Sequence, residues 1–125
     1  MRIWNLTPHV MHYDDGHIRR VLPSDGIVRL IQVEEPAEPI DGMTTVHTRY
    51  AEAVGVPAEV APGDAVIVST LVGDLWPRRS RPVGVTVLVP DTGASCRRDE
   101  QGRIASVSRF IRKTSALIPE NNQYA

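Results

Sequence analysis

Short apolar runs alternate with turn-forming residues along the whole chain. Ten prolines and nine glycines separate segments rich in valine, isoleucine and threonine. This pattern is typical of several brief strands joined by turns. The sequence therefore predicts a mainly β domain, a small barrel or sandwich of about six to eight strands with at most one or two short helices.

The most apolar run is AVIVST at residues 65–70, and it predicts a central buried strand. VGVTVLV at 83–89 predicts a second buried strand, and IVRLIQV at 27–33 predicts a further strand. The DDG turn signal inside residues 10–22 indicates a hairpin. RRDEQGR indicates the tip of a further hairpin, with Gly102 as its turn residue.

Other segments are less regular. IWNLT near the start predicts a strand that Pro8 bends or places at an edge, since proline has no N–H to donate. EEPAEPIDG predicts an exposed loop. MTTVHTRYAEAV begins as a strand, and its second half stays undecided because it contains helix formers. Ser69 and the TLVGD that follows resemble a strand-to-helix turn.

The length of 125 residues fits one domain. We predict a single β-rich domain over residues 1–113 and a loosely held tail over 114–125. The lone Cys96 excludes a disulfide within the chain, and a reducing environment suits that usage. Because the first residues are polar and no run of about 18 apolar residues occurs, we expect a cytoplasmic protein without a membrane partner.

The net charge of −1 conceals an uneven distribution. Residues 1–74 carry five arginines against eleven acidic residues, whereas residues 75–113 carry nine basic residues against three acidic ones. This asymmetry indicates either an anionic partner for the C-terminal half or self-association of an acidic face with a basic one. Alternatively, the two halves interleave in the fold and their fields cancel.

The segment LWPRRSRP carries the candidate site. Arg78, Arg79 and Arg81 carry planar guanidinium groups whose N–H donors match the oxygens of phosphate and carboxylate. The neighbouring Trp76 could stack on a base or on an arginine. Arg98 and Arg103 join them if the strand at 83–89 pairs with the one that starts near Arg103. The alternative is a solvated loop whose arginines pair with acids of the N-terminal half, within one subunit or across an interface. Nucleic acid is an improbable partner, because the net charge is near zero and only six residues are aromatic.

No group of residues in the sequence identifies a particular reaction. His9 and His12 would point to opposite faces of a strand, so the sequence predicts no metal site. Cys96 beside two arginines could form a thiolate, but nothing places a base next to it.

Asp91 in VPDTGAS predicts a turn, with Asp91 capping the backbone and Gly93 supplying a positive φ. Asn5, Thr7 and His9 predict either a polar site or a hydrogen-bonding network that fixes the bend. We therefore predict no catalytic residue and no cofactor.

Several short motifs occur in a recognisable order. The motifs are NLTPH near the start, PSDG before a strand, and then IVSTLV, VLVPDTG and RDEQGRI. With these motifs in this order, the chain resembles small proteins encoded by tailed phages, prophages and actinobacterial genomes. The likeness covers most of residues 3–112. It implies a phage or mobile-element origin and carries no known activity or catalytic residue. LWPRRSRPVGV departs from the pattern, so the basic loop is particular to this chain.

Two functional hypotheses follow. The first is a non-enzymatic, phage-related and oligomeric binding module that recognises an anionic small molecule, such as a nucleotide signal, or an acidic patch of a host protein. Its ligand-binding residues would be those of the candidate site: Trp76, Arg78, Arg79, Arg81, Arg98 and Arg103. The second is a virion or assembly protein that self-associates through its acidic and basic halves.

Overall fold

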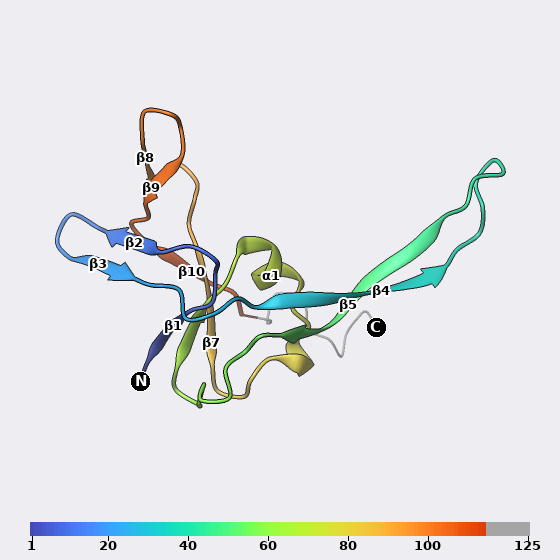
Figure 1. Cartoon of the computed structure of the whole chain (residues 1–125), viewed down its shortest axis with the longest axis horizontal. Coiled ribbons are helices and arrows are strands. Elements are labelled where there is room, and N and C mark those ends of the chain that lie inside the picture. Colours follow the sequence, from blue (N-terminus) through green and yellow to red (C-terminus); the bar gives the residue numbers. More distant parts are fainter. Residues whose placement is uncertain (115–125) are drawn as a thin grey trace.

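The fold is mainly β in the computed structural model, which describes residues 1–114 (Figure 1). In chain order, the elements are β1 (Ile3–Asn5), β2 (Met11–Asp14), β3 (Arg19–Leu22), β4 (Arg29–Pro36), β5 (Val46–Val54), β6 (Ala65–Ile67), α1 (Thr70–Leu75), the 3₁₀ turn η1 (Arg78–Ser80), β7 (Thr86–Pro90), β8 (Arg97–Arg98), β9 (Ile104–Ser106) and β10 (Phe110–Arg112). The mainly β prediction with two short helical elements is confirmed.

The barrel prediction is wrong for the described residues, because no sheet among them closes on itself. One four-stranded sheet carries the order β1-β6-β7-β10, and the other strands form three separate hairpins. None of the helices within residues 1–114 is long and apolar enough to cross a membrane. Nearly all of the predicted tail, residues 115–125, lies outside the described residues.

The four-stranded sheet mixes parallel and antiparallel pairs. β6 lies between β1 and β7 and is parallel to both, whereas β10 is antiparallel to β7. All three residues of β6 are buried, as the apolar run predicted. Parallel neighbours need a crossover connection of a dozen or more residues. Residues 68–85 form that crossover. The basic segment, with α1 and η1, therefore lies in the connection between β6 and β7.

Helix α1 covers one face of this sheet. The Ser69 hydroxyl caps its start by accepting the N–H of Val72 at 3.3 Å, as the expected strand-to-helix turn requires. Val72 and Trp76 are four residues apart and therefore share a helical face. Both belong to the main core, which also contains Trp4, Leu6, Val28, Val66, Val68, Val87 and Val89. At Gly73 the backbone approaches the sheet so closely that a Cβ would lie 2.4 Å from Cγ1 of Val89.

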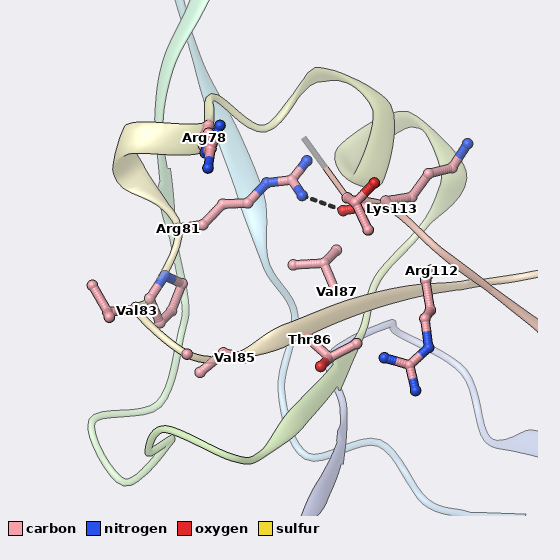
Figure 2. Close-up of a pocket in the computed structure, with 11 residues that line it drawn as sticks. Arg78, Arg81, Val83, Val85, Thr86, Val87, Arg112 and Lys113 are labelled. Carbon is pink, nitrogen blue, oxygen red and sulfur yellow. Dashed lines mark hydrogen bonds between the residues drawn. The ribbon is translucent and has the colours of Figure 1, made fainter. Parts of the chain in front are cut away.

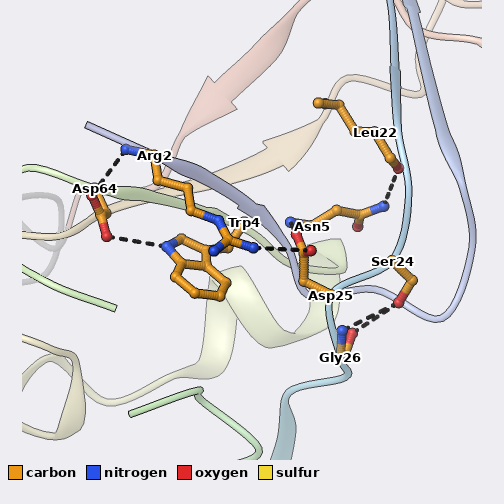
Figure 3. Close-up of polar contacts among 8 residues, drawn as sticks. All are labelled: Arg2, Trp4, Asn5, Leu22, Ser24, Asp25, Gly26 and Asp64. Atoms are coloured by element: carbon orange, nitrogen blue, oxygen red, sulfur yellow. Dashed lines mark hydrogen bonds and ion pairs between the residues drawn. The ribbon is translucent and has the colours of Figure 1, made fainter. Parts of the chain in front are cut away.

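A polar network fixes the bend after β1, and Figure 3 shows its contact between Asn5 and Leu22. The buried Asn5 amide donates to the carbonyls of His9 and Leu22, each at 2.8 Å, and its oxygen accepts from the N–H and hydroxyl of Thr7. His9 takes part through its carbonyl alone. Of the two interpretations of this segment, the structure supports the network that fixes the bend.

Two hairpins lie side by side at one end of the molecule (Figure 1). β2 and β3 form the first, which confirms the hairpin predicted within residues 10–22. In its turn, the N–H groups of Ile18 and His17 and the hydroxyl of Tyr13 lower the pKa of Asp15 to about 2. β8 and β9 form the second, with Gly102 at a φ of 80° in its turn, as predicted.

β4 and β5 form the longest hairpin, which projects away from the rest of the molecule (Figure 1). We call residues 29–54 the arm. The loop predicted for EEPAEPIDG is only partly present, because residues 34–36 belong to β4 and only the remainder forms the tip. The undecided segment RYAEAV is entirely strand. Every residue of EEPAEPIDG except the half-buried Ala37 is exposed, so its predicted exposure is confirmed.

Candidate functional site

Arg81 has a structural role in the crossover. Its guanidinium donates to the carbonyls of Gly73 at 2.8 Å, Trp76 at 3.2 Å and Lys113 at 2.5 Å. Partial burial lowers the pKa of Arg81 from its ordinary value, yet guanidinium stays protonated at neutral pH. Arg81 therefore joins the end of α1 to the end of β10, and most of its donors are not available to a ligand.

Trp76 is not the exposed stacking platform that the sequence suggested. Its side chain is 2% exposed and packs in the core, so it offers no face to a base. The guanidinium carbon of Arg81 lies 5.9 Å from the centre of the Trp76 ring. Of the two stacking partners that the sequence suggested for Trp76, an arginine or a base, the structure therefore has the arginine. The indole Nε1 has no hydrogen-bond acceptor among the described residues. Its four-residue spacing from Val72 was the sequence signal for this burial.

Arg78 and Arg79 project from η1 and are exposed. Neither forms an ion pair with any residue in the described range 1–114. The alternative interpretation, in which acids of the N-terminal half pair with the loop arginines, therefore does not hold within one subunit for Arg78 and Arg79 among those residues. The two guanidiniums keep their donors facing solvent.

Arg78 borders an open groove of about 520 Å³ between η1 and the edge of the sheet (Figure 2). Its lining residues are Arg78, Arg81, Pro82, Val83, Gly84, Val85, Thr86, Val87, Arg112, Lys113 and Thr114. Four of these side chains are cationic, and no carboxylate of the described chain lines the groove. We call it the basic groove.

The four cations of the basic groove differ in their partners. Lys113 forms an ion pair with Asp74, with Nζ and Oδ1 2.7 Å apart, and Arg81 is engaged by backbone carbonyls. Arg78 and Arg112 have no acidic partner within residues 1–114 and lie on different elements that border the groove. Both guanidiniums are therefore free to contact anionic groups of a ligand that lies along the groove.

Sequence reasoning missed Arg112 and Lys113. β10 runs antiparallel to β7 with Arg112 opposite Leu88, and Lys113 follows it. This register brings the basic end of β10 next to the crossover. The signal was the pair of cations that ends the strand segment FIRK, but its meaning depends on which strand β10 joins.

Arg98 and Arg103 do not belong to this site. β7 pairs with β10, and the strand that begins at Ile104 pairs with β8, so the condition that would have brought them together is not met. The β8–β9 hairpin projects far from η1 (Figure 1). The Arg98 guanidinium donates to the carbonyls of Gly102 at 2.8 Å and Thr92 at 3.2 Å and so stabilises its own hairpin.

The remaining candidates from the sequence were a metal site and Asp91. Within residues 1–114, no three histidine, cysteine or acidic side chains gather as metal ligands would. Asp91 accepts the N–H of Gly93 at 3.0 Å, as the predicted turn requires, but Gly93 does not adopt a positive φ. The hydrogen bond from the Arg109 side chain lowers the pKa of Asp91 most, and the hydrogen bond from the N–H of Gly93 lowers it further.

Comparisons with protein-family models, curated proteins and solved structures found no match for this chain.

Proposed function

We propose that this chain is a non-enzymatic binding module whose basic groove holds an anionic group. The observation that carries the proposal is the pair Arg78 and Arg112, which border one groove without a carboxylate partner among residues 1–114. A guanidinium presents a planar fork of donors that fits phosphate or carboxylate oxygens in pairs. Such an anion would replace solvent between η1 and β10.

The groove also restricts the ligand. Val83, Val85 and Val87 give it apolar surface, so a ligand with a small apolar part beside its anionic group fits best. A nucleotide would be held through its phosphates, because Trp76 offers no stacking surface. An acidic patch of a host protein would present carboxylates to the same arginines. The phage-related origin belongs to this proposal and rests on the order of the short sequence motifs from NLTPH to RDEQGRI.

A ligand screen tests the proposal. We expect inorganic phosphate, nucleoside phosphates or small dicarboxylates at millimolar concentration to raise the melting temperature, since a ligand that binds only the folded state stabilises it. The increase should be lost in Arg78→Ala and in Arg112→Ala. Arg103→Ala is the matched control, because this exposed arginine lies on the distant β8–β9 hairpin. No change in melting temperature with any of these anions would contradict the proposal.

The alternative function, assembly through acidic and basic parts of the chain, is favoured by a separate observation. The arm carries no buried residue along its whole length from Arg29 to Val54. An isolated two-stranded hairpin is marginally stable in water. A partner that covers the arm would supply the contacts that it lacks.

A further inference from the structure

The arm ends in a tight and well-defined tip. Ile40 and Met43 exchange both backbone hydrogen bonds, at 3.0 and 2.8 Å, and the two residues between them have φ values of 49° and 76°. Positive φ at both central positions identifies a type I′ turn, for which Asp-Gly is a favoured pair. The tip therefore presents the Asp41 carboxylate at its end, in a conformation set by the backbone.

The tip combines apolar and acidic surface. Ile40 is 63% exposed and Met43 is 62% exposed, although both are large apolar side chains. Glu38 and Asp41 lie beside them, and neither forms an ion pair with another residue of the described chain. A surface that fits the tip must offer both cations and apolar side chains.

The basic groove offers that combination. Arg78 and Arg112 supply cations without acidic partners in the described range, and Val83 at the rim is 86% exposed. Charge and hydrophobic character are thus complementary between the tip and the groove. Such pairing of opposite charges speeds association and selects the partner.

A tip cannot reach the groove of its own chain. The base of the arm lies against the body, where β5 contacts η1, and the arm then extends away from the body (Figure 1). Eight residues of β4 span roughly 26 Å in a strand conformation. The tip is therefore directed away from η1, toward another molecule.

We propose that the tip of the arm, residues 38–43, docks into the basic groove of a second copy of this chain. This inference rests on the proposed function, since it assigns the anion of the groove to Glu38 and Asp41 of another copy. Ile40 and Met43 then cover Val83 at the rim. The contact joins two different surfaces, so two copies close into a dimer if the exchange is mutual and form a longer chain if it is not.

The test is the oligomeric state of the full chain, measured by sedimentation velocity over a series of protein and salt concentrations. We expect association to increase with protein concentration and to weaken at least about tenfold between low and high salt, because screening reduces pairing of exposed charges. A monomer at every concentration would overturn the inference.

Matched variants locate the contact. Asp41→Asn removes the charge and keeps a residue that tolerates positive φ, so the turn persists. Combined with Glu38→Gln, it should weaken association at least about tenfold, as should Arg78→Glu. Arg103→Glu makes the same charge change on the β8–β9 hairpin and should leave association unchanged. Association that survives in the tip variant would overturn the inference.

A charge exchange separates this inference from the proposed function. Arg78→Glu mixed with Glu38→Arg should restore association that each variant lacks alone. If the tip variant still gains thermal stability from phosphate but the wild-type chain never associates, the groove binds small anions and the docking inference fails. If association and its rescue occur while phosphate has no effect, docking stands and the small-molecule proposal fails.

Discussion

The guanidinium of Arg81 donates to the backbone carbonyl of Lys113, 32 positions further along the chain, with a distance of 2.5 Å between nitrogen and oxygen. The same side chain donates to the carbonyls of Gly73 and Trp76. One arginine thus connects the helix of the crossover with the last strand of the sheet. The basic groove forms between these two elements, so its shape depends on a residue that sequence alone assigned to a ligand.

We therefore expect Arg81→Lys to lower the free energy of unfolding by about 2–4 kcal/mol, since a single ammonium cannot reproduce the planar fork and leaves partly buried carbonyls without donors. Urea unfolding of the two proteins measures the difference. Arg79→Lys is the control, because Arg79 is exposed and forms no ion pair with residues 1–114, and it should change stability by less than about 0.5 kcal/mol. Equal effects of both variants would contradict the role of Arg81.

Local patterns predicted much of the fold. The hairpin within residues 10–22 and the turn at Gly102 depend on neighbouring residues and are present as expected, and the buried strand predicted at 65–70 is present over residues 65–67. The parallel pairing of β1, β6 and β7 depends on contacts between distant segments, which local patterns do not contain. Strands were predicted on both sides of EEPAEPIDG, but the full length of the arm was missed because the prolines of that segment indicated a loop, whereas Pro36 ends β4 at a position that the hairpin tolerates.

The candidate site was predicted in part. The crossover arginines were found because their charge is visible in the sequence, but the sequence does not say which are engaged by backbone carbonyls. Arg112 joins Arg78 only through the register between β10 and β7. Burial of Trp76 follows from its helical spacing to Val72, a signal that the adjacent arginines obscured.

Gly73→Ala should destabilise the protein although alanine is the better helix former. A methyl group at this position would lie 2.4 Å from Cγ1 of Val89 and 3.2 Å from Cγ of Lys113, so α1 would have to move away from the sheet. We expect a loss of about 1–3 kcal/mol after the gain in helix propensity of about 1 kcal/mol is included. Thermal or urea unfolding measures it.

Val89→Ala provides the matched test of that prediction. It removes the clashing methyl group and leaves a space, so Gly73→Ala should cost less in the Val89→Ala background than in the wild-type chain. Additive effects of the two substitutions would show that the contact with Val89 is not the cause.

Asn5→Asp should destabilise the bend after β1 more than its size change suggests. The carboxylate keeps an acceptor for Thr7 but has no hydrogen to donate to the carbonyls of His9 and Leu22. Two acceptors would then face a negative charge at a position that is 1% exposed. We expect a loss of about 3 kcal/mol or more in urea unfolding. Gln32→Glu, an exposed amide-to-acid change on the arm, should have little effect; a similar loss there would contradict the prediction.

Asp64 should make stability depend on acidic pH. The N–H of Ala61, the indole Nε1 of Trp4 and the N–H of Arg2 all donate to its carboxylate and lower its pKa. Figure 3 shows the contacts with Trp4 and Arg2. Because the folded pKa is below the unfolded value of about 3.9, the charged carboxylate stabilises the folded state fully above that value. The contribution is lost as the pH falls toward the folded pKa.

Asp64→Asn should therefore lower the melting temperature at pH 7, where the wild-type carboxylate is ionised and accepts three hydrogen bonds. The difference between the two proteins should narrow as the pH falls below about 4, because only the wild-type chain has the Asp64 contribution to lose there. Melting temperatures between pH 7 and pH 2.5 measure it. Glu59→Gln, at an exposed position without a hydrogen bond or ion pair to its side chain within residues 1–114, should follow the wild-type curve closely. A difference for Asp64→Asn that stays constant down to pH 2.5 would mean that the three donors do not favour the charged form.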